Sequence, residues 1–496
     1  PYDGEIAYAD SQVARVLDRL RTRGLLARTL VVVAGDHGEG LGDHGERTHG
    51  MLVYDSTLRV PLIVTAPGHP AGTRNEAVSL VDLAPTLLRA AGITPPAAMP
   101  GRNLLEARGP AARGEGDRDL YSESEYPRVA GWSPLQALTD GRWMTIRAGA
   151  ATEMYDLQSD PRQEHDLGST RSTAAAAMAA RAEAIHASAV PSGTQNISAD
   201  ARERLRSLGY VASSPPAGSP SNAANPSARI ASWNEFEGAL AELTSDPADA
   251  EAKLRRLAAE NPDAPVIQTT YARALKEIGR LDAALTVYRQ AARRWPTDAV
   301  LLHDLAVTAR DAAGMAKGPG ATALHDEAVR ADQAALTLAP DSAAALNGAG
   351  LLAIDDGHVA QAVKAFERAA SLDSSNASYW ANLGNARRAA GDRAGAEQAY
   401  RRSLDLDART ADAANGLGVL LVEMKRPAEA ARWFQRAIAD APDLIEARLN
   451  LGIALQETGD RAGAAAEYRR VLGAGGNHPR EKDAAGKLLA AVGRGR

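Results

Sequence analysis

Residues 377–404 read ASYWANLGNARRAAGDRAGAEQAYRRSL, and this stretch contains the pattern from which we predict the fold of the C-terminal half. Small residues let two helices approach closely, and an aromatic side chain can fill the gap that remains. A glycine, an alanine and an aromatic residue of this stretch each recur every 34 positions along the C-terminal half. This period is the length of a helix-turn-helix repeat. The three columns are Gly350, Gly384, Gly418 and Gly452; Ala362, Ala396, Ala430 and Ala464; Phe366, Tyr400, Phe434 and Tyr468.

The repeat also predicts where the helix pairs turn and where the array begins and ends. Glycines that fit the frame mark the turn of each unit, and Lys425 stands where one of them would be. An insertion of ten residues precedes Gly350, and we expect residues 315–321 to form much of a longer loop there. We assign residues 231–474 to one degenerate unit, which is the first and starts near residue 231, and six clear units, and residues 475–496 to a capping helix and tail.

Residues 1–170 mix helical and strand patterns, which predicts an α/β domain. Residues 29–34 and 60–65 are short apolar runs, typical of strands that are buried on both faces. Asp140-Gly141 lies between two strand-like runs and predicts a hairpin. Helical spacing covers residues 6–20 and 83–88. We interpret residues 171–230 as a linker, with helices near 174–189 and 199–208 and a flexible Ser/Pro/Gly-rich stretch at 213–227.

The composition excludes several classes of protein. The 496 residues exceed what one core accommodates. A net charge of −6 argues against a nucleic-acid-binding protein, and no apolar stretch is long enough for a membrane span. The chain has no cysteine, which excludes disulfides and a cysteine nucleophile within it. It opens on Pro1, and we expect it to begin inside a domain.

The segment most informative about chemistry is GDHGEGLGDHG, residues 35–45, which directly follows the first predicted strand. Flanking glycines allow the chain to turn so that Asp36 and His37 face one cation, and His44 and His49 lie within reach of the same loop. A carboxylate and an imidazole are half a ligand set for a divalent cation. The alternative is that Asp36 caps a turn and His37 is a solvated loop residue.

The N-terminal half resembles the sulfatases of the alkaline-phosphatase superfamily. The matching stretches are TLVVVAGDHG (29–38), HGMLVYDSTLRVPLIVTAP (49–67), VDLAPTLLRAAG (81–92) and EMYDLQSDPRQEHDL (153–167). The resemblance implies that Asp36 and His37 bind a divalent metal, usually calcium, and that His49 contacts the sulfate or phosphate group. His44 has no firm family role, and we expect it to stabilise the loop.

By this resemblance, residues 1–170 form the C-terminal portion of a metal-dependent sulfuric ester hydrolase. The family's nucleophile is a formylglycine made from Cys/Ser-x-Pro-x-Arg, expected upstream and absent here, so we expect this chain not to turn over. One alternative is a phosphoethanolamine or phosphoglycerol transferase, or a phosphodiesterase, of the same superfamily. Another is a scaffold with a vestigial catalytic part. The resemblance also favours a periplasmic or extracellular location.

The 34-residue units resemble tetratricopeptide (TPR) repeats, whose superhelix lines its concave face with the first helix of each pair. Asparagine is a poor helix former, yet four asparagines lie in these first helices. We consider two roles for them: hydrogen bonds to an extended peptide or protein partner in the groove, or bridges between neighbouring helices. These asparagines are Asn347, Asn382, Asn415 and Asn450.

Overall fold

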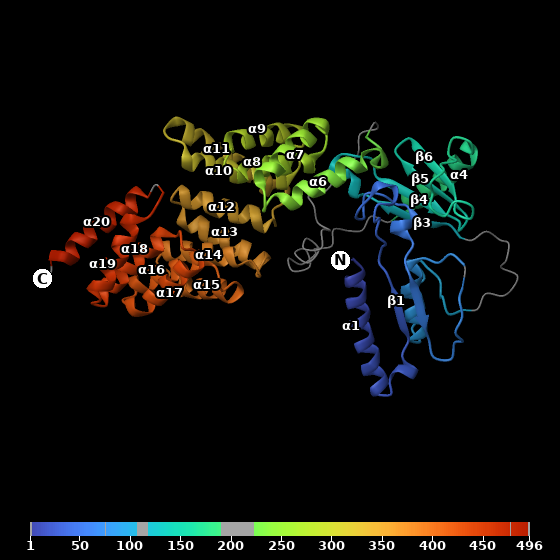
Figure 1. Cartoon of the computed structure of the whole chain (residues 1–496), viewed down its shortest axis with the longest axis horizontal. Coiled ribbons are helices and arrows are strands. Elements are labelled where there is room, and N and C mark those ends of the chain that lie inside the picture. Colours follow the sequence, from blue (N-terminus) through green and yellow to red (C-terminus); the bar gives the residue numbers. More distant parts are fainter. Residues whose placement is uncertain (1, 75, 107–117, 190–222, 477, 495–496) are drawn as a thin grey trace. The chain divides into compact units, whose positions relative to one another are not determined.

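The computed structural model describes residues 2–74, 76–106, 118–189, 223–476 and 478–494 (Figure 1). Contacts within these residues define two compact units, divided between residues 267 and 268. The first unit combines the N-terminal residues up to 189 with residues 223–267. The predicted helix at 199–208 and most of the predicted flexible stretch at 213–227 lie outside the described residues.

The first unit begins with a helix and a two-stranded antiparallel sheet. Helix α1 (Tyr2–Thr22) is followed by β1 (Val31–Ala34) and β2 (Leu62–Thr65), which are paired so that Val32 lies opposite Val64. Both predicted strands are confirmed, but their predicted burial on both faces is wrong: Val33 is 39% exposed and Ile63 60% exposed. In the described residues each strand pairs only with the other, so alternate side chains remain at the surface.

A second, four-stranded antiparallel sheet follows the short helices α2 (Asp55–Leu58) and α3 (Leu83–Ala90). Its strands are adjacent in sequence order: β3 (Leu120–Ser124), β4 (Leu135–Thr139), β5 (Trp143–Ala148) and β6 (Ala151–Asp156). The predicted hairpin at Asp140-Gly141 is confirmed, and Gly141 takes the positive φ of 94° that such a turn requires. Helix α4 (Ser172–Ser188) packs on this sheet through Met178 and Ala182, so the unit extends beyond residue 170.

Two further helices complete the first unit. These are α6 (Ile230–Glu242) and α7 (Pro247–Glu260), which the sequence suggested as the degenerate first repeat. Trp233 on α6 is only 2% exposed, and its ring makes edge contacts with Tyr126 and Trp132 at centroid distances of 5.6 and 6.2 Å. Aromatic packing of this kind is a large part of core stability.

The second unit is an array of antiparallel helix pairs (Figure 1). The predicted long loop at 315–321 is wrong, because α10 runs to Met315 and α11 begins at Pro319, so the inserted residues lengthen the helices instead. The helices of the array are α8 (Pro265–Glu277), α9 (Leu281–Arg294), α10 (Ala299–Met315), α11 (Pro319–Leu338), α12 (Ala343–Asp355), α13 (Val359–Leu372), α14 (Ala377–Ala389), α15 (Arg393–Leu406), α16 (Ala411–Glu423), α17 (Pro427–Asp440), α18 (Ile445–Glu457), α19 (Arg461–Gly473) and the closing α20 (Pro479–Arg494).

The glycine and aromatic columns meet inside each helix pair. A Cβ on Gly418 would lie 2.5 Å from the ring of Phe434, and Gly384 stands in the same relation to Tyr400 at 2.6 Å. These aromatic side chains are fully buried. The repeated units therefore share one packing arrangement. The glycine on the first helix leaves room for the aromatic ring of the second helix.

Candidate functional site

The loop from Gly35 to Gly50 leaves the end of β1 and folds back on itself. Gly38 N donates to Thr57 O at 2.8 Å, and Gly40 N donates to Thr48 O at 2.7 Å. A Cβ on Gly38 would lie 2.1 Å from Ser56 O, and one on Gly40 would lie 2.4 Å from Glu46 O. Gly38 and Gly40 are therefore required because other backbone segments pass too close for a side chain. The same close approach fixes the position of the residue between them.

Asp36 and His37 lie next to each other, but they differ in exposure. The Asp36 side chain is 86% exposed and that of His37 is 32% exposed, with 3.9 Å between Asp36 Oδ2 and His37 Nε2. His37 Nδ1 lies 2.8 Å from Gly38 O. Because a carbonyl can only accept, Nδ1 is the donor in this bond, which leaves Nε2 as the ring nitrogen that faces Asp36.

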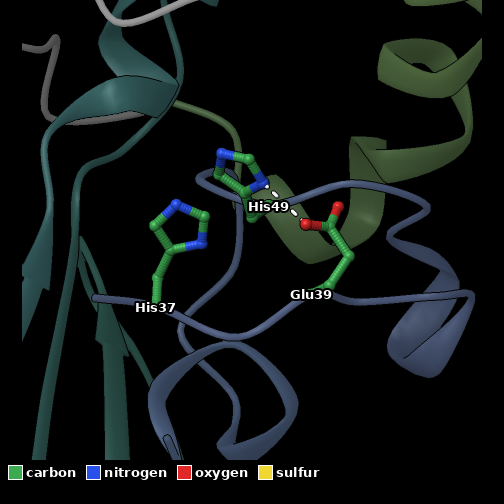
Figure 2. Close-up of side chains that lie close together, drawn as sticks. All are labelled: His37, Glu39 and His49. Atoms are coloured by element: carbon green, nitrogen blue, oxygen red, sulfur yellow. Dashed lines mark hydrogen bonds and ion pairs between the residues drawn. The ribbon is translucent and has the colours of Figure 1, made fainter. Parts of the chain in front are cut away.

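The structure brings His37 and His49 together with a third residue that the sequence analysis missed, Glu39. One ligand atom from each lies within 4.8 Å of the others (Figure 2). His49 Nδ1 bonds to Glu39 Oε2 at 3.0 Å, and the two imidazole rings lie 4.0 Å apart between centroids. The Glu39 side chain is 20% exposed. Glu39 is two residues after His37 in the sequence. This spacing could have indicated its role, because alternate residues of an extended segment lie on the same side.

His44 makes contacts of a different kind. It has a positive φ of 51°, its ring stacks on Tyr54 at 3.5 Å, and its Nε2 lies 3.0 Å from Arg162 O. Gln163, next to Arg162, accepts from Asp55 N at 2.7 Å through its side chain. The 153–167 segment therefore supports the loop, and His44 is one of its points of contact.

A buried carboxyl lies beneath the cluster. Glu46 is 1% exposed, its Oε1 accepts from Met51 N at 2.7 Å, and its Oε2 has no hydrogen-bond partner. Burial raises the pKa of Glu46 to about 7, and the nearby charges of Glu237 and Glu39 add to the increase. Burial also raises the pKa of Glu237. The surroundings of His49 are therefore rich in carboxyl groups.

The four asparagines of the repeat half form two pairs. Asn382 Nδ2 donates to Asn347 Oδ1 at 2.8 Å, and Asn450 Nδ2 donates to Asn415 Oδ1 at 3.0 Å. Each bond joins the first helices of successive pairs. A cavity of about 240 Å³ lies between the two asparagine pairs and is lined by Asn382, Asn415 and Arg388 among others. The asparagines thus bridge helices and also border a hollow.

None of the helices in the described residues is both long and apolar enough to cross a membrane.

Comparisons with known proteins match the two halves separately. Residues 1–93 match the family model described as sulfatase. Residues 381–445 match one model described as tetratricopeptide repeat, and residues 243–308 and 421–488 match another. The chain is therefore similar to sulfatases over residues 1–93 and to tetratricopeptide repeats over these later segments.

Curated relatives of the N-terminal half carry sulfatase names. An uncharacterized sulfatase, YidJ, of Escherichia coli (strain K12) is 32% identical over 161 residues, which is 32% of each protein. A choline-sulfatase of Rhizobium meliloti (strain 1021) is 31% identical over 164 residues, which is 32% of this chain and 31% of the relative. The chain spans about a third of the length of these relatives.

Among solved structures, a tetratricopeptide repeat protein from Parabacteroides merdae ATCC 43184 covers 53% of this chain and is itself covered to 99%. It is 16% identical to this chain, with a TM-score of 0.41.

Proposed function

We propose that the first unit contributes the metal-binding and ester-orienting side of a metal-dependent sulfuric ester hydrolase. The observation that carries the proposal is the convergence of His37, Glu39 and His49 on one loop, beside Asp36, within a segment that matches sulfatases. The sulfatase relatives support the class of ester, and the chemistry of the loop supports binding of a cation and an anion close together.

The side chains present fit a divalent cation. His37 Nε2 and Asp36 Oδ2 are 3.9 Å apart, which allows both to bind one ion after a small movement of the exposed Asp36. Calcium is the ion that the resemblance implies, whereas imidazole ligands suit zinc better than calcium. A bound cation would supply positive charge to the ester oxygens.

His49 is the residue that we assign to the sulfate group. Its Nδ1 is held by Glu39 Oε2 at 3.0 Å, so a carboxylate orients the ring. An imidazolium can donate to an ester oxygen and stabilise charge that develops there. The formylglycine motif that the resemblance implies has no counterpart in these residues, so we expect no turnover by this chain alone.

Calorimetric titration of the 496-residue chain with calcium, manganese and zinc tests the metal site without requiring turnover. We expect one site, and we expect Asp36→Ala and His37→Ala each to weaken its affinity at least about tenfold, since each removes a ligand of roughly 1.4 kcal/mol or more. Asp43→Ala, which removes an exposed carboxylate from the same loop, is the matched control. Equal affinity in all the variants would contradict the assignment. A chain that binds no cation would favour the scaffold alternative.

For the repeat half we propose binding of an extended peptide from a protein partner. The cavity bordered by Asn382 and Asn415 supports it, because asparagine amides can bond to a peptide backbone on both sides. Peptides selected from a random library on the full chain should lose about fivefold or more in affinity when Asn382 or Asn415 is changed to Ala. Fluorescence anisotropy measures this loss. Unchanged affinity with unchanged thermal stability would leave the asparagines as helix bridges only.

A further inference from the structure

Helix α6 makes direct contacts with the loop that carries His49. Thr48 Oγ1 donates to Glu237 and lies 3.1 and 3.2 Å from its two carboxylate oxygens. Asn234 Nδ2 donates to Gly45 O at 2.7 Å, and a Cβ on Gly45 would meet the Ile230 side chain at 3.1 Å. Figure 2 shows a green helix of these residues behind the loop. The loop from Gly35 to Gly50 and helix α6, which are far apart in the sequence, therefore pack directly against each other.

Thr48 links the two halves of the site loop. Its carbonyl accepts from Gly40 N at 2.7 Å, and its hydroxyl donates to Glu237. Gly40 follows Glu39, and His49 follows Thr48, so this backbone bond joins the residues next to the two side chains that bond at 3.0 Å. A displacement of Thr48 would change the separation of Glu39 and His49.

The position of α6 itself is fixed by the core of the first unit. Trp233 is 2% exposed against the rings of Tyr126 and Trp132. Just before the helix, Ser133 N donates to Ala224 O at 2.9 Å. Glu237 is consequently presented from a helix that is anchored in this core. Its carboxylate is partly withdrawn from water, which costs free energy unless hydrogen bonds such as that of Thr48 compensate.

We propose that Glu237 is a positioning residue of the site: by holding the Thr48 hydroxyl, it sets the place of His49 relative to Glu39. The role of His49 in ester binding rests on the proposed function, whereas the coupling between Glu237 and His49 does not. The sequence suggested α6 as the start of the repeat array. It follows from the proposal that this helix supports the site loop, Gly35 to Gly50.

Histidine NMR of the full chain tests this coupling in a chelating buffer. With ¹³C at the histidine Cε1, His49 is assigned by the signal lost in His49→Gln. We expect Glu237→Ala to shift the His49 signal, and we expect Glu237→Gln, which keeps an acceptor for Thr48, to restore most of it. The matched control is Glu235→Ala, since Glu235 lies on the same helix and pairs with Arg256 on α7.

Thr48→Val removes the same hydrogen bond without altering α6. It should shift His49 as Glu237→Ala does, and the double variant should shift it no further than either single variant. A His49 signal that moves as little in Glu237→Ala and Thr48→Val as in Glu235→Ala would overturn the proposal. If the coupling is seen but wild-type protein binds no cation, the proposed function fails and this inference stands.

Discussion

At the scale of the residue, the site loop places side chains where their ordinary chemistry is altered. Its glycines bring backbone against backbone, and the loop thereby buries Glu46 at 1% exposure with one oxygen unpaired. Burial favours the protonated form of such a carboxyl, and it raises the pKa of Glu46 to about 7. Glu46 therefore makes the stability of the first unit depend on pH near neutrality.

Glu46→Gln should stabilise the first unit at pH 8 and change it little at pH 4. The pKa of Glu46 is raised from 4.5 to about 7, so its favourable contribution is complete below about pH 4.5 and is lost as pH rises through about 7. The gain in the free energy of unfolding that we expect from Glu46→Gln at pH 8, relative to pH 4, is roughly 3 kcal/mol at most. Urea unfolding in a chelating buffer at both pH values measures it. A gain of the same size at pH 4 would refute the explanation, and Asp43→Asn serves as the exposed control.

At the scale of the element, the repeat half repeats one kind of helix packing and one kind of turn between the helices of a pair. Glycines end the first helix at positive φ, with 75° at Gly357, 83° at Gly391 and 88° at Gly459. Lys425 occupies the same place with a φ of 61°. A residue with a Cβ is strained in this region, whereas glycine is not.

Lys425→Gly should therefore raise the free energy of unfolding of the array by about 0.5–1 kcal/mol, since the strain relieved exceeds the extra entropy that glycine loses on folding. The side chain is exposed, so little packing is lost. Gly391→Lys, the reverse change in the preceding unit, should destabilise by about the same amount. Denaturant unfolding followed by circular dichroism distinguishes these outcomes. Destabilisation by Lys425→Gly would show that the turn is not strained.

At the scale of the whole molecule, the division of the chain differs from the division of its sequence patterns. The repeat-like segment begins near residue 231, yet contacts group residues 223–267 with the N-terminal unit. The bond between Thr48 and Glu237 joins residues 189 positions apart. Deletion of everything after the linker would thus remove a wall of the candidate site together with the array.

Short patterns along the chain were enough to predict the elements that are formed by residues close together in sequence. A 34-residue period predicted the helix pairs because each aromatic ring packs on a glycine of its own unit, only 16 positions away, as Phe434 does on Gly418. The strands, the hairpin and the loop bearing Asp36, His37 and His49 were likewise predictable from short patterns. The lengthened helices around residues 315–319 were not, because an insertion shows its size but not the conformation it takes.

The set of side chains that share the site could be identified from the folded chain alone. Glu39 joins His37 and His49, Asp36 projects into solvent, and Glu237 arrives from a distant helix. The asparagines pair across helices instead of standing singly along a groove. These contacts depend on how loops fold back and how helices pack, and both bring together residues that no local sequence pattern relates.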